Sequence, residues 1–269
     1  MMTEEAKKLA EKSRYDFSDL VELMRILRAP GGCPWDRAQT HESIRRNLIE
    51  ETYEVVEAID NGDRKLMREE LGDLLMQVVF HAEMAKEDGE FDIGDVIHDV
   101  TAKLVYRHPH IFKDVTADTT DEVLANWEQL KNKEKKRKTP KDRMDAVPPS
   151  LPALMRADKV SSVAGKYGFD FPDAADAMQK IDEELAEVKA AGTADELFEE
   201  VGDLLFSTAN FARKCGFSAE EALGRAVDKF RKRFLGMNEL LEKDGKKLEE
   251  VTLPEMDSYW NMAKMDKKR

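Results

Sequence analysis

Apolar residues along the chain recur at intervals of three and four positions, which is the spacing of one face of a helix. In the C-terminal half, Val201, Leu204 and Leu205 begin such a stripe. A fuller stripe in the N-terminal half has the spacing of a buried helix face: Leu71, Leu74, Leu75, Val78 and Val79. Alternation with a period of two is weak throughout, so no sheet is expected. The pattern predicts an all-α fold.

Turn and cap signals divide this pattern into separate helices. The turn Asn61-Gly62-Asp63 separates two helices in the N-terminal half. In the C-terminal half, Gly192 ends a helix, and Thr193 with Glu196 forms a capping box for the next one. Capping boxes of the same kind precede a later helix in each half: Thr119 with Glu122, and Thr252 with Glu255.

Four short motifs occur twice, in the same order, at offsets of 133, 130, 126 and 133 residues. They are EExxE at 50–54 and 183–187, ExxD at 70–73 and 200–203, KxxxR at 103–107 and 229–233, and WxxxK at 127–131 and 260–264. A fixed order at nearly constant offsets indicates a duplicated unit. We therefore expect two tandem helical bundles of about four helices each, at residues 1–140 and 153–269, joined by a basic, proline-rich linker at 141–152.

The charge and hydropathy of the chain argue against nucleic acids and membranes as binding partners. The formal net charge is −13, which argues against a nucleic-acid binder with a broadly basic surface. In the run 131–143, eight of thirteen residues are Lys or Arg, but no aromatic residue is interleaved, so a solvated segment is favoured over a nucleic-acid contact. The most apolar stretch, 71–85, is too short to span a bilayer. With no apolar signal segment at the N-terminus, the sequence predicts a cytoplasmic protein.

The duplicated acidic motifs predict a metal site. On a helix, Glu51 and Glu54 project from one face, as do Glu70 and Asp73 on the next helix. Antiparallel packing of the two helices would bring the four carboxylates together, as it would in the second copy: Glu184, Glu187, Glu200 and Asp203. Unit charges ~4 Å apart repel by ~4 kcal/mol at an effective dielectric constant near ~20, so such a cluster requires a counter-charge. A lone acidic motif of this kind is usually a solvated helix face; its recurrence with the ExxD partner favours the metal site.

The chemical type of the predicted ligands indicates which metal ion the site would bind. All five histidines lie in the first copy, so the repeated constellation offers only oxygen ligands. Oxygen donors favour Mg²⁺, with Mn²⁺ as a substitute, over zinc or iron, and a helical di-iron site would need ExxH pairs that neither ExxD motif supplies. Downstream, the pairs Lys103 with Arg107 and Lys229 with Arg233 each lie on one helical face and are suited to a polyphosphate.

With these motifs the chain resembles the MazG family of nucleotide pyrophosphohydrolases. The resemblance rests on the EExxE and ExxD pairs and on Gly32-Cys33-Pro34-Trp35-Asp36 followed by Gln39-Thr40-His41, which is similar to the N-terminal signature of the family. It implies an all-α, Mg²⁺-dependent enzyme that converts nucleoside triphosphates to the monophosphate and pyrophosphate. It also implies a homodimer in which helices of two chains complete the bundle.

The resemblance also implies roles for individual residues. Glu184, Glu187, Glu200 and Asp203 would be the Mg²⁺ ligands of the second copy, and the first copy retains Glu51, Glu54, Glu70 and Asp73. The nucleotide contacts would be Lys229, Arg233, Trp260 and the flanking segments 180–183 and 196–199, including Lys180, Glu183, Glu196 and Glu199; the first copy offers Lys103, Arg107, Trp127 and Lys131. Glu183 or Glu50 is the candidate proton acceptor.

Two other functions share some features with this sequence. A Nudix hydrolase is disfavoured, because residues 69–72 match its motif only in part and Arg68 stands where that motif requires an upstream glutamate. A non-catalytic helical module that binds metal and nucleotide for regulation remains the alternative to the enzyme.

Overall fold

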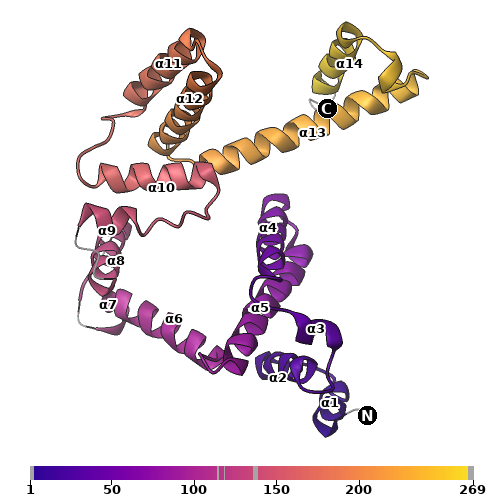
Figure 1. The fold of residues 1–269 in the computed structure, drawn as a ribbon, viewed down its shortest axis with the longest axis vertical. Coiled ribbons are helices and arrows are strands. Elements are labelled where there is room, and N and C mark those ends of the chain that lie inside the picture. The colour runs from indigo at the N-terminus through magenta and orange to yellow at the C-terminus, as the bar shows by residue number, and fades with distance from the viewer. Residues whose placement is uncertain (1–2, 114, 118, 136–138, 266–269) are drawn as a thin grey trace. The chain divides into compact units, whose positions relative to one another are not determined.

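The computed structural model describes residues 3–113, 115–117, 119–135 and 139–265. Helices and the turns between them account for all regular structure in these ranges, so the predicted all-α fold is confirmed. The chain divides into two compact units, Met1–Lys131 and Asn132–Arg269, which are described one at a time (Figure 1). No helix in the described part of the chain is both long and apolar enough to cross a membrane.

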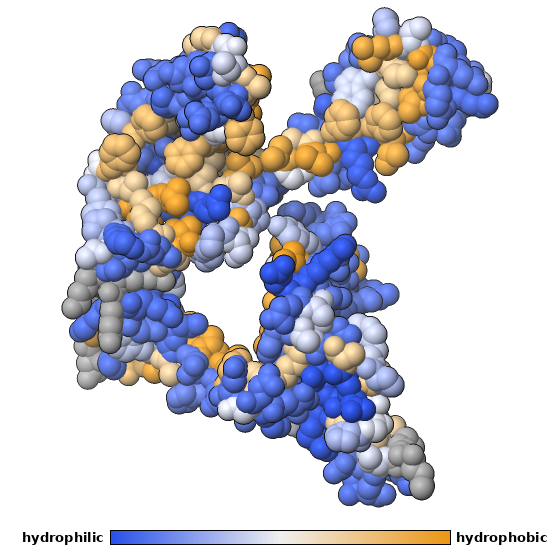
Figure 2. Space-filling view, viewed as in Figure 1, coloured by the Kyte–Doolittle hydropathy of each residue, from blue (hydrophilic) through white to orange (hydrophobic). Residues whose placement is uncertain are grey.

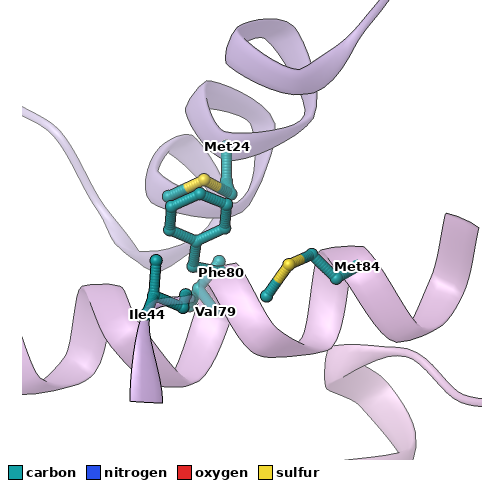
Figure 3. Close-up of a cluster of buried hydrophobic side chains, with 5 residues drawn as sticks. All are labelled: Met24, Ile44, Val79, Phe80 and Met84. Atoms are coloured by element: carbon teal, nitrogen blue, oxygen red, sulfur yellow. The ribbon is translucent and has the colours of Figure 1, made fainter. Parts of the chain in front are cut away.

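The N-terminal unit is built around one helical hairpin. Its helices are α1 (Glu4–Ala10), α2 (Phe17–Arg28), α3 (Pro34–Ala38), α4 (Arg45–Asn61), α5 (Arg64–Glu87), α6 (Ile93–Arg107), α7 (Pro109–Phe112) and α8 (Thr120–Glu134), the last of which crosses the boundary to the second unit. Helices α4 and α5 pack against each other along their length, and α2 packs on α5. The core lies where α2 packs on α5. Five side chains from α2, from α5 and from the residue before α4 are buried there: Met24, Ile44, Val79, Phe80 and Met84 (Figure 3).

The turn between α4 and α5 follows from its sequence. Gly62 ends α4 with φ of 66°, a left-handed conformation that a residue without Cβ adopts at little cost. Asp63 then caps α5, because its carboxylate accepts hydrogen bonds from the backbone N–H of Lys65 at 2.9 Å and Leu66 at 3.0 Å. The predicted turn at 61–63 is confirmed, and it sets the two acidic motifs on adjacent antiparallel helices.

The C-terminal unit repeats this hairpin. Its elements are α9 (Pro140–Met144), α10 (Ala153–Gly165), α11 (Ala174–Ala190), α12 (Ala194–Lys214), α13 (Ala219–Lys243), the 3-10 turn η1 (Leu248–Glu250) and α14 (Leu253–Met265). Helices α11 and α12 form the hairpin, α10 packs on α12, and α14 folds back on α13 (Figure 1). The predicted capping boxes at Thr193 with Glu196 and at Thr119 with Glu122 are confirmed by reciprocal hydrogen bonds.

Three expectations from the sequence need correction. Each unit has more than the about four helices expected; α2 and α10, which pack on the second hairpin helix, are among the additional ones. The predicted linker contains a helix, α9, which Thr139 caps and Pro140 begins; residues 136–138 of the basic run lie outside the described residues. The stripe that begins at Leu71 was expected to be buried throughout, but only Val79, at its end, is fully buried. Leu71, Leu75 and Val78 are 47, 40 and 37% exposed, so the described helices of the unit leave this side of the hairpin open.

Candidate metal and nucleotide site

The α11–α12 hairpin brings three carboxylates of the C-terminal unit together. Glu184 and Glu187 lie on one face of α11, and Glu200 lies on the facing side of α12. Each can present an oxygen within 4.8 Å of the other two. Glu184 is buried, Glu200 is half-buried and Glu187 is exposed, so the cluster opens to solvent on one side. The three-residue spacing in α11 and the antiparallel packing produce this convergence, as the sequence predicts.

Lys180 supplies part of the counter-charge of this cluster. Its ammonium lies 2.7 Å from Glu184 and 2.8 Å from Glu183, one turn further along α11. The hydrogen bond from Lys180 holds the pKa of Glu184 below its usual value, although burial of the carboxylate opposes the shift. The hydrogen bond between Glu187 and Glu184, together with desolvation, raises the pKa of Glu187. The cluster therefore retains excess negative charge beside one ammonium, which is a suitable environment for a divalent cation.

The N-terminal unit has a matching cluster without such a lysine. Oxygens of Glu51 on α4 and of Glu70 and Asp73 on α5 lie within 4.8 Å of one another. Desolvation and then the nearby charges of Asp73 and Glu54 raise the pKa of Glu51. The pKa of Glu70 is raised by desolvation and then by Glu54. At the position of Lys180, 133 residues earlier, the sequence has Asn47, so here carboxylates face one another without the ammonium found in the C-terminal unit.

In each copy the structure gathers three of the four predicted ligands. The fourth differs between the units: Glu54 in the first and Asp203 in the second. Both side chains are exposed on the same hairpins, and Glu54 acts on the pKa values of Glu51 and Glu70, which places it beside the N-terminal cluster. Asp203 lies one turn after Glu200 on α12. Glu54 therefore lies near its cluster, whereas Asp203 shares a helix with Glu200 and stays a predicted ligand.

The two candidate proton acceptors lie next to the clusters and are exposed. Glu183 precedes Glu184 and is paired with Lys180. Glu50 precedes Glu51 and accepts a hydrogen bond from Arg46 at 2.8 Å. Each candidate is therefore one residue from a buried or half-buried carboxylate of its cluster and open to solvent, where a proton can be passed on.

Glu196 has a structural contact that the sequence also predicts. Its carboxylate accepts hydrogen bonds from the backbone N–H of Gly192 at 2.8 Å and of Thr193 at 3.1 Å, and these bonds lower its pKa. The carboxylate thus closes the start of α12, where the helix dipole favours negative charge. Glu199 is exposed one turn later on the same helix.

The basic pairs lie on the helix that follows each hairpin. Lys229 is exposed and Arg233 half-buried on α13, and among the described residues no ion pair engages either of them. Lys103 and Arg107 occupy α6, where Lys103 is half-buried and Arg107 is buried. Within one chain, no described contact joins Lys229 or Arg233 to the carboxylates of α11 and α12.

The tryptophans of the two WxxxK motifs are partly covered by neighbouring side chains. The ring of Trp127 lies 5.3 Å from the Arg107 guanidinium and 4.7 Å from the Lys131 ammonium. Trp260 has Lys264 at 5.8 Å and packs at 5.2 Å against the ring of Phe230. The WxxxK motif thus gives a cation over an aromatic ring in both units, and a base that stacked on either tryptophan would compete with these contacts.

Sequence reasoning missed polar residues that lie on the carboxylate-bearing face of the second hairpin helix. Ser207 donates to Glu184 at 3.5 Å, and Gln77, at the same place in the N-terminal unit, is buried. Both follow the aspartate of the ExxD motif by four residues, so the spacing alone places them on its face. A third, His81, lies beside His41 with a distance of 2.7 Å between the two Nδ1 atoms; nothing in the sequence joins this pair.

Comparison with known proteins gives a consistent result. Residues 39–112 and 174–234 match the family described as the MazG nucleotide pyrophosphohydrolase domain. The chain is 47% identical over 248 residues to the nucleoside triphosphate pyrophosphohydrolase/pyrophosphatase MazG of Thermotoga maritima, covering 92% of this chain and 95% of the relative. It is 43% identical over 251 residues to a nucleoside triphosphate pyrophosphohydrolase of Escherichia coli K12, covering 91% and 95%. It is also 44% identical over 259 residues to the uncharacterized protein YabN of Bacillus subtilis, covering 95% of this chain and 53% of YabN.

Proposed function

The chain belongs to the MazG family of nucleotide pyrophosphohydrolases, and we propose that its α11–α12 carboxylate cluster is the centre at which it works. The protein is a nucleoside triphosphate pyrophosphohydrolase, an enzyme that hydrolyses an acid anhydride bond. The observation that carries the proposal is the convergence of Glu184, Glu187 and Glu200 within 4.8 Å on two antiparallel helices.

The cluster fits Mg²⁺, with Mn²⁺ as a substitute. Its three residues offer only carboxylate oxygens, which these ions prefer, and Lys180 keeps the pKa of Glu184 low so that this ligand is ionised. Asp203, one turn after Glu200 on α12, would complete the set. When bound, the ion supplies positive charge to the triphosphate and makes a coordinated water more acidic. Glu51, Glu54, Glu70 and Asp73 would hold an ion in the same way in the N-terminal unit.

The remaining steps are assigned to side chains of this protein. A water attacks the α-phosphorus, the bond from that phosphorus to the α–β bridging oxygen breaks, and pyrophosphate leaves. Glu183 accepts the proton of the water, as Glu50 would in the N-terminal unit. Lys229 and Arg233 bind the phosphates and balance the charge that develops on the departing pyrophosphate. Lys180, already within 2.8 Å of two carboxylates, would lie beside the bound phosphates as a further cation.

We also propose that the active form is a homodimer. Large apolar side chains on α12 and α13 are exposed in the single chain, among them Phe198 at 82%, Leu205 at 53% and Phe230 at 59%. Exposed apolar side chains that gather over neighbouring helices in this way (Figure 2) usually mark an interface. A second copy would cover it and would bring Lys229 and Arg233 of one chain to the carboxylates of the other, which explains why no contact joins them within one chain.

The experiment that tests the function is a nucleotide panel. Purified protein is incubated with nucleoside and deoxynucleoside triphosphates and Mg²⁺, and pyrophosphate, orthophosphate and the nucleotide products are measured. We expect monophosphate and pyrophosphate in equal amounts. Diphosphate with orthophosphate would show that a different bond is cleaved. Binding of nucleotide without turnover would favour the regulatory module instead.

A further inference from the structure

Two histidines join the segment before α4 to the middle of α5. The Nδ1 atoms of His41 and His81 lie 2.7 Å apart, and the planes of the two rings differ by 8°. The ring centroids lie 5.0 Å apart, which is the distance between the nitrogens extended by one ring radius at each end. The rings are therefore nearly coplanar and meet edge to edge, with each Nδ1 directed at the other.

This geometry places one proton between the two nitrogens. In the hydrogen bond that joins them, one Nδ1 carries a hydrogen and donates it, while the other Nδ1 accepts through its lone pair. If both nitrogens carried a hydrogen, two N–H groups would point at each other and no bond would form. The contact between His41 and His81 therefore requires that one of the two Nδ1 atoms is unprotonated.

Two buried atoms on α5 indicate which ring donates. The Nε2 atom of His81 is buried without a hydrogen-bond partner among the described residues, and so is the Oε1 atom of Gln77, one turn earlier on the same helix face. Gln77 is only 4% exposed, and its Oε1 can accept but not donate. A hydrogen on Nε2 of His81 is the form that would satisfy this oxygen. Nδ1 of His81 then accepts from the Nδ1–H of His41.

The pair lies beside the buried core of the N-terminal unit. Ile44, three residues after His41, is 2% exposed and packs with Val79 and Phe80, the two residues before His81 (Figure 3). An apolar contact and the histidine contact thus hold the segment 39–44 on the same part of α5.

Several charged side chains around the pair have partners of their own. Arg28 of α2 donates to the backbone carbonyl of Gln39, which fixes the start of the segment, and forms an ion pair with Glu87. On α5, Glu83 and Lys86 form an ion pair with each other. These charges are balanced without the histidines.

The segment itself and the start of α4 carry two further charges. Hydrogen bonds from its own backbone N–H and from Thr40, and then the charges of His41 and Arg45, lower the pKa of Glu42. The pKa of His81 is lowered first by burial and then by the charge of His41. Among the described residues, no charge from α2, α4 or α6 shifts it. The two histidines therefore titrate against each other.

We propose that the His41–His81 pair is an acid-sensitive latch that holds the segment 39–44 on α5. A first proton from solvent binds Nε2 of His41 and leaves the bond between the two Nδ1 atoms intact. A second proton has to bind Nδ1 of His81, which removes the acceptor and sets two positive rings against each other. The latch is closed at neutral pH and opens in acid.

The direction of the pH effect follows from His81. An unperturbed histidine titrates near pH ~6.5, whereas the pKa of His81 in the closed latch is lower. The open segment therefore binds protons more readily than the closed one. The stabilisation that the latch supplies is complete above about pH 6.5 and is lost as the pH falls through the lowered pKa of His81.

Hydrogen exchange of the full-length protein tests the latch. The reporters are the backbone N–H groups of Thr40, Ser43 and Ile44, which are hydrogen-bonded within the segment. Their protection, corrected for the intrinsic effect of pH on exchange, is measured at about pH 7.5 and about pH 5, on either side of the histidine range. The variants are His41→Ala and His81→Leu, and His98→Ala, at an exposed position of α6, is the control.

We expect protection in the wild type and in His98→Ala to fall roughly tenfold in acid, the scale of one lost hydrogen bond. His41→Ala should show the low protection at both pH values, and so should His81→Leu if it folds. Repulsion among the hairpin carboxylates is common to all these proteins, so differences between them isolate the latch. Wild-type protection that is equal at the two pH values would overturn the proposal, as would an undiminished acid step in His41→Ala.

Discussion

Lys180 is the residue that most clearly distinguishes the two carboxylate clusters. In the C-terminal unit its ammonium lies 2.7 Å from Glu184 and lowers the pKa of that carboxyl. The N-terminal unit has Asn47 at this position, and there the pKa values of Glu51 and Glu70 are raised. An ionised ligand binds a cation without first losing a proton, so the C-terminal cluster is better prepared for metal at neutral pH.

This difference predicts unequal effects of the same substitution in the two units. Glu184→Gln removes the buried ligand and should lower kcat by on the order of a hundredfold or more, with the melting temperature little changed. Glu51→Gln is the matched control at the same motif position and should retain most of the activity. A reversal, with Glu51→Gln inactive and Glu184→Gln like wild type, would assign catalysis to the N-terminal unit.

A second residue-scale prediction concerns the basic pair of α13. Arg233→Ala removes a cation that has no ion-pair partner among the described residues of its own chain. A fork of charge-assisted hydrogen bonds to phosphate contributes about 1.5–3 kcal/mol, so kcat/KM should fall correspondingly while thermal stability stays nearly constant. Arg225→Ala, on an exposed turn of the same helix, is the control. Equal kcat/KM for the two variants would contradict the phosphate-binding role.

At the scale of elements, each cluster takes its carboxylates from two neighbouring helices. Without a bound cation, the negative charges of these carboxylates repel one another. Raised pKa values at Glu51 and Glu70 mean that the folded N-terminal hairpin binds protons more tightly than the unfolded chain. Their contribution to stability is therefore present at low pH and is lost as the pH rises through the raised pKa values. A divalent cation at neutral pH should replace the protons.

We therefore expect Mg²⁺ to raise the melting temperature more at about pH 7.5 than at about pH 5, where protons already relieve the repulsion between the carboxylates. Thermal unfolding with and without MgCl₂ at the two pH values measures this difference. The double variant Glu51→Gln with Glu184→Gln should lose most of the Mg²⁺ effect. An equal Mg²⁺ effect at both pH values would argue against carboxylates as the ligands.

The elements also show what the sequence can and cannot predict. Motifs that act within one helix or one turn, such as the Thr193 capping box and the Gly62 turn, were predictable because local chemistry decides them. The pairing of acidic motifs followed from a short turn between two helices. The exposure of Leu71 and the packing of α10 on α12 depend on which helices cover which faces, and helical periodicity alone carries no information about the partner. Contacts between residues far apart in the sequence, such as His41 with His81, could not be predicted for the same reason.

For the whole molecule, the proposed homodimer would account both for the uncovered apolar faces and for a basic pair without an ion-pair partner among the described residues. The face of α12 leaves Leu205 53% exposed, and α13 carries Phe230 at 59% exposure together with Lys229 and Arg233. A twofold dimer buries such faces symmetrically and exchanges cations between the two sites. Leu205→Glu should therefore shift the protein toward the monomer in light scattering and reduce its activity, whereas Leu253→Glu, at an exposed position that begins α14, should do neither.

The exchange of cations between chains predicts a result that a monomer cannot give. Glu184→Gln removes a carboxylate from the site on its own chain. Arg233→Ala removes the cation that its chain would supply to the site on the other chain. In a mixed dimer of these two variants, one site combines both defects and the other combines two intact halves. Dissociating and reassembling an equal mixture should thus restore about a quarter of the wild-type activity, because half of the dimers are mixed and each has one intact site. Unmixed samples of each variant are the controls. If the reassembled mixture stays as inactive as they are, the carboxylates and the basic pair of a site belong to the same chain.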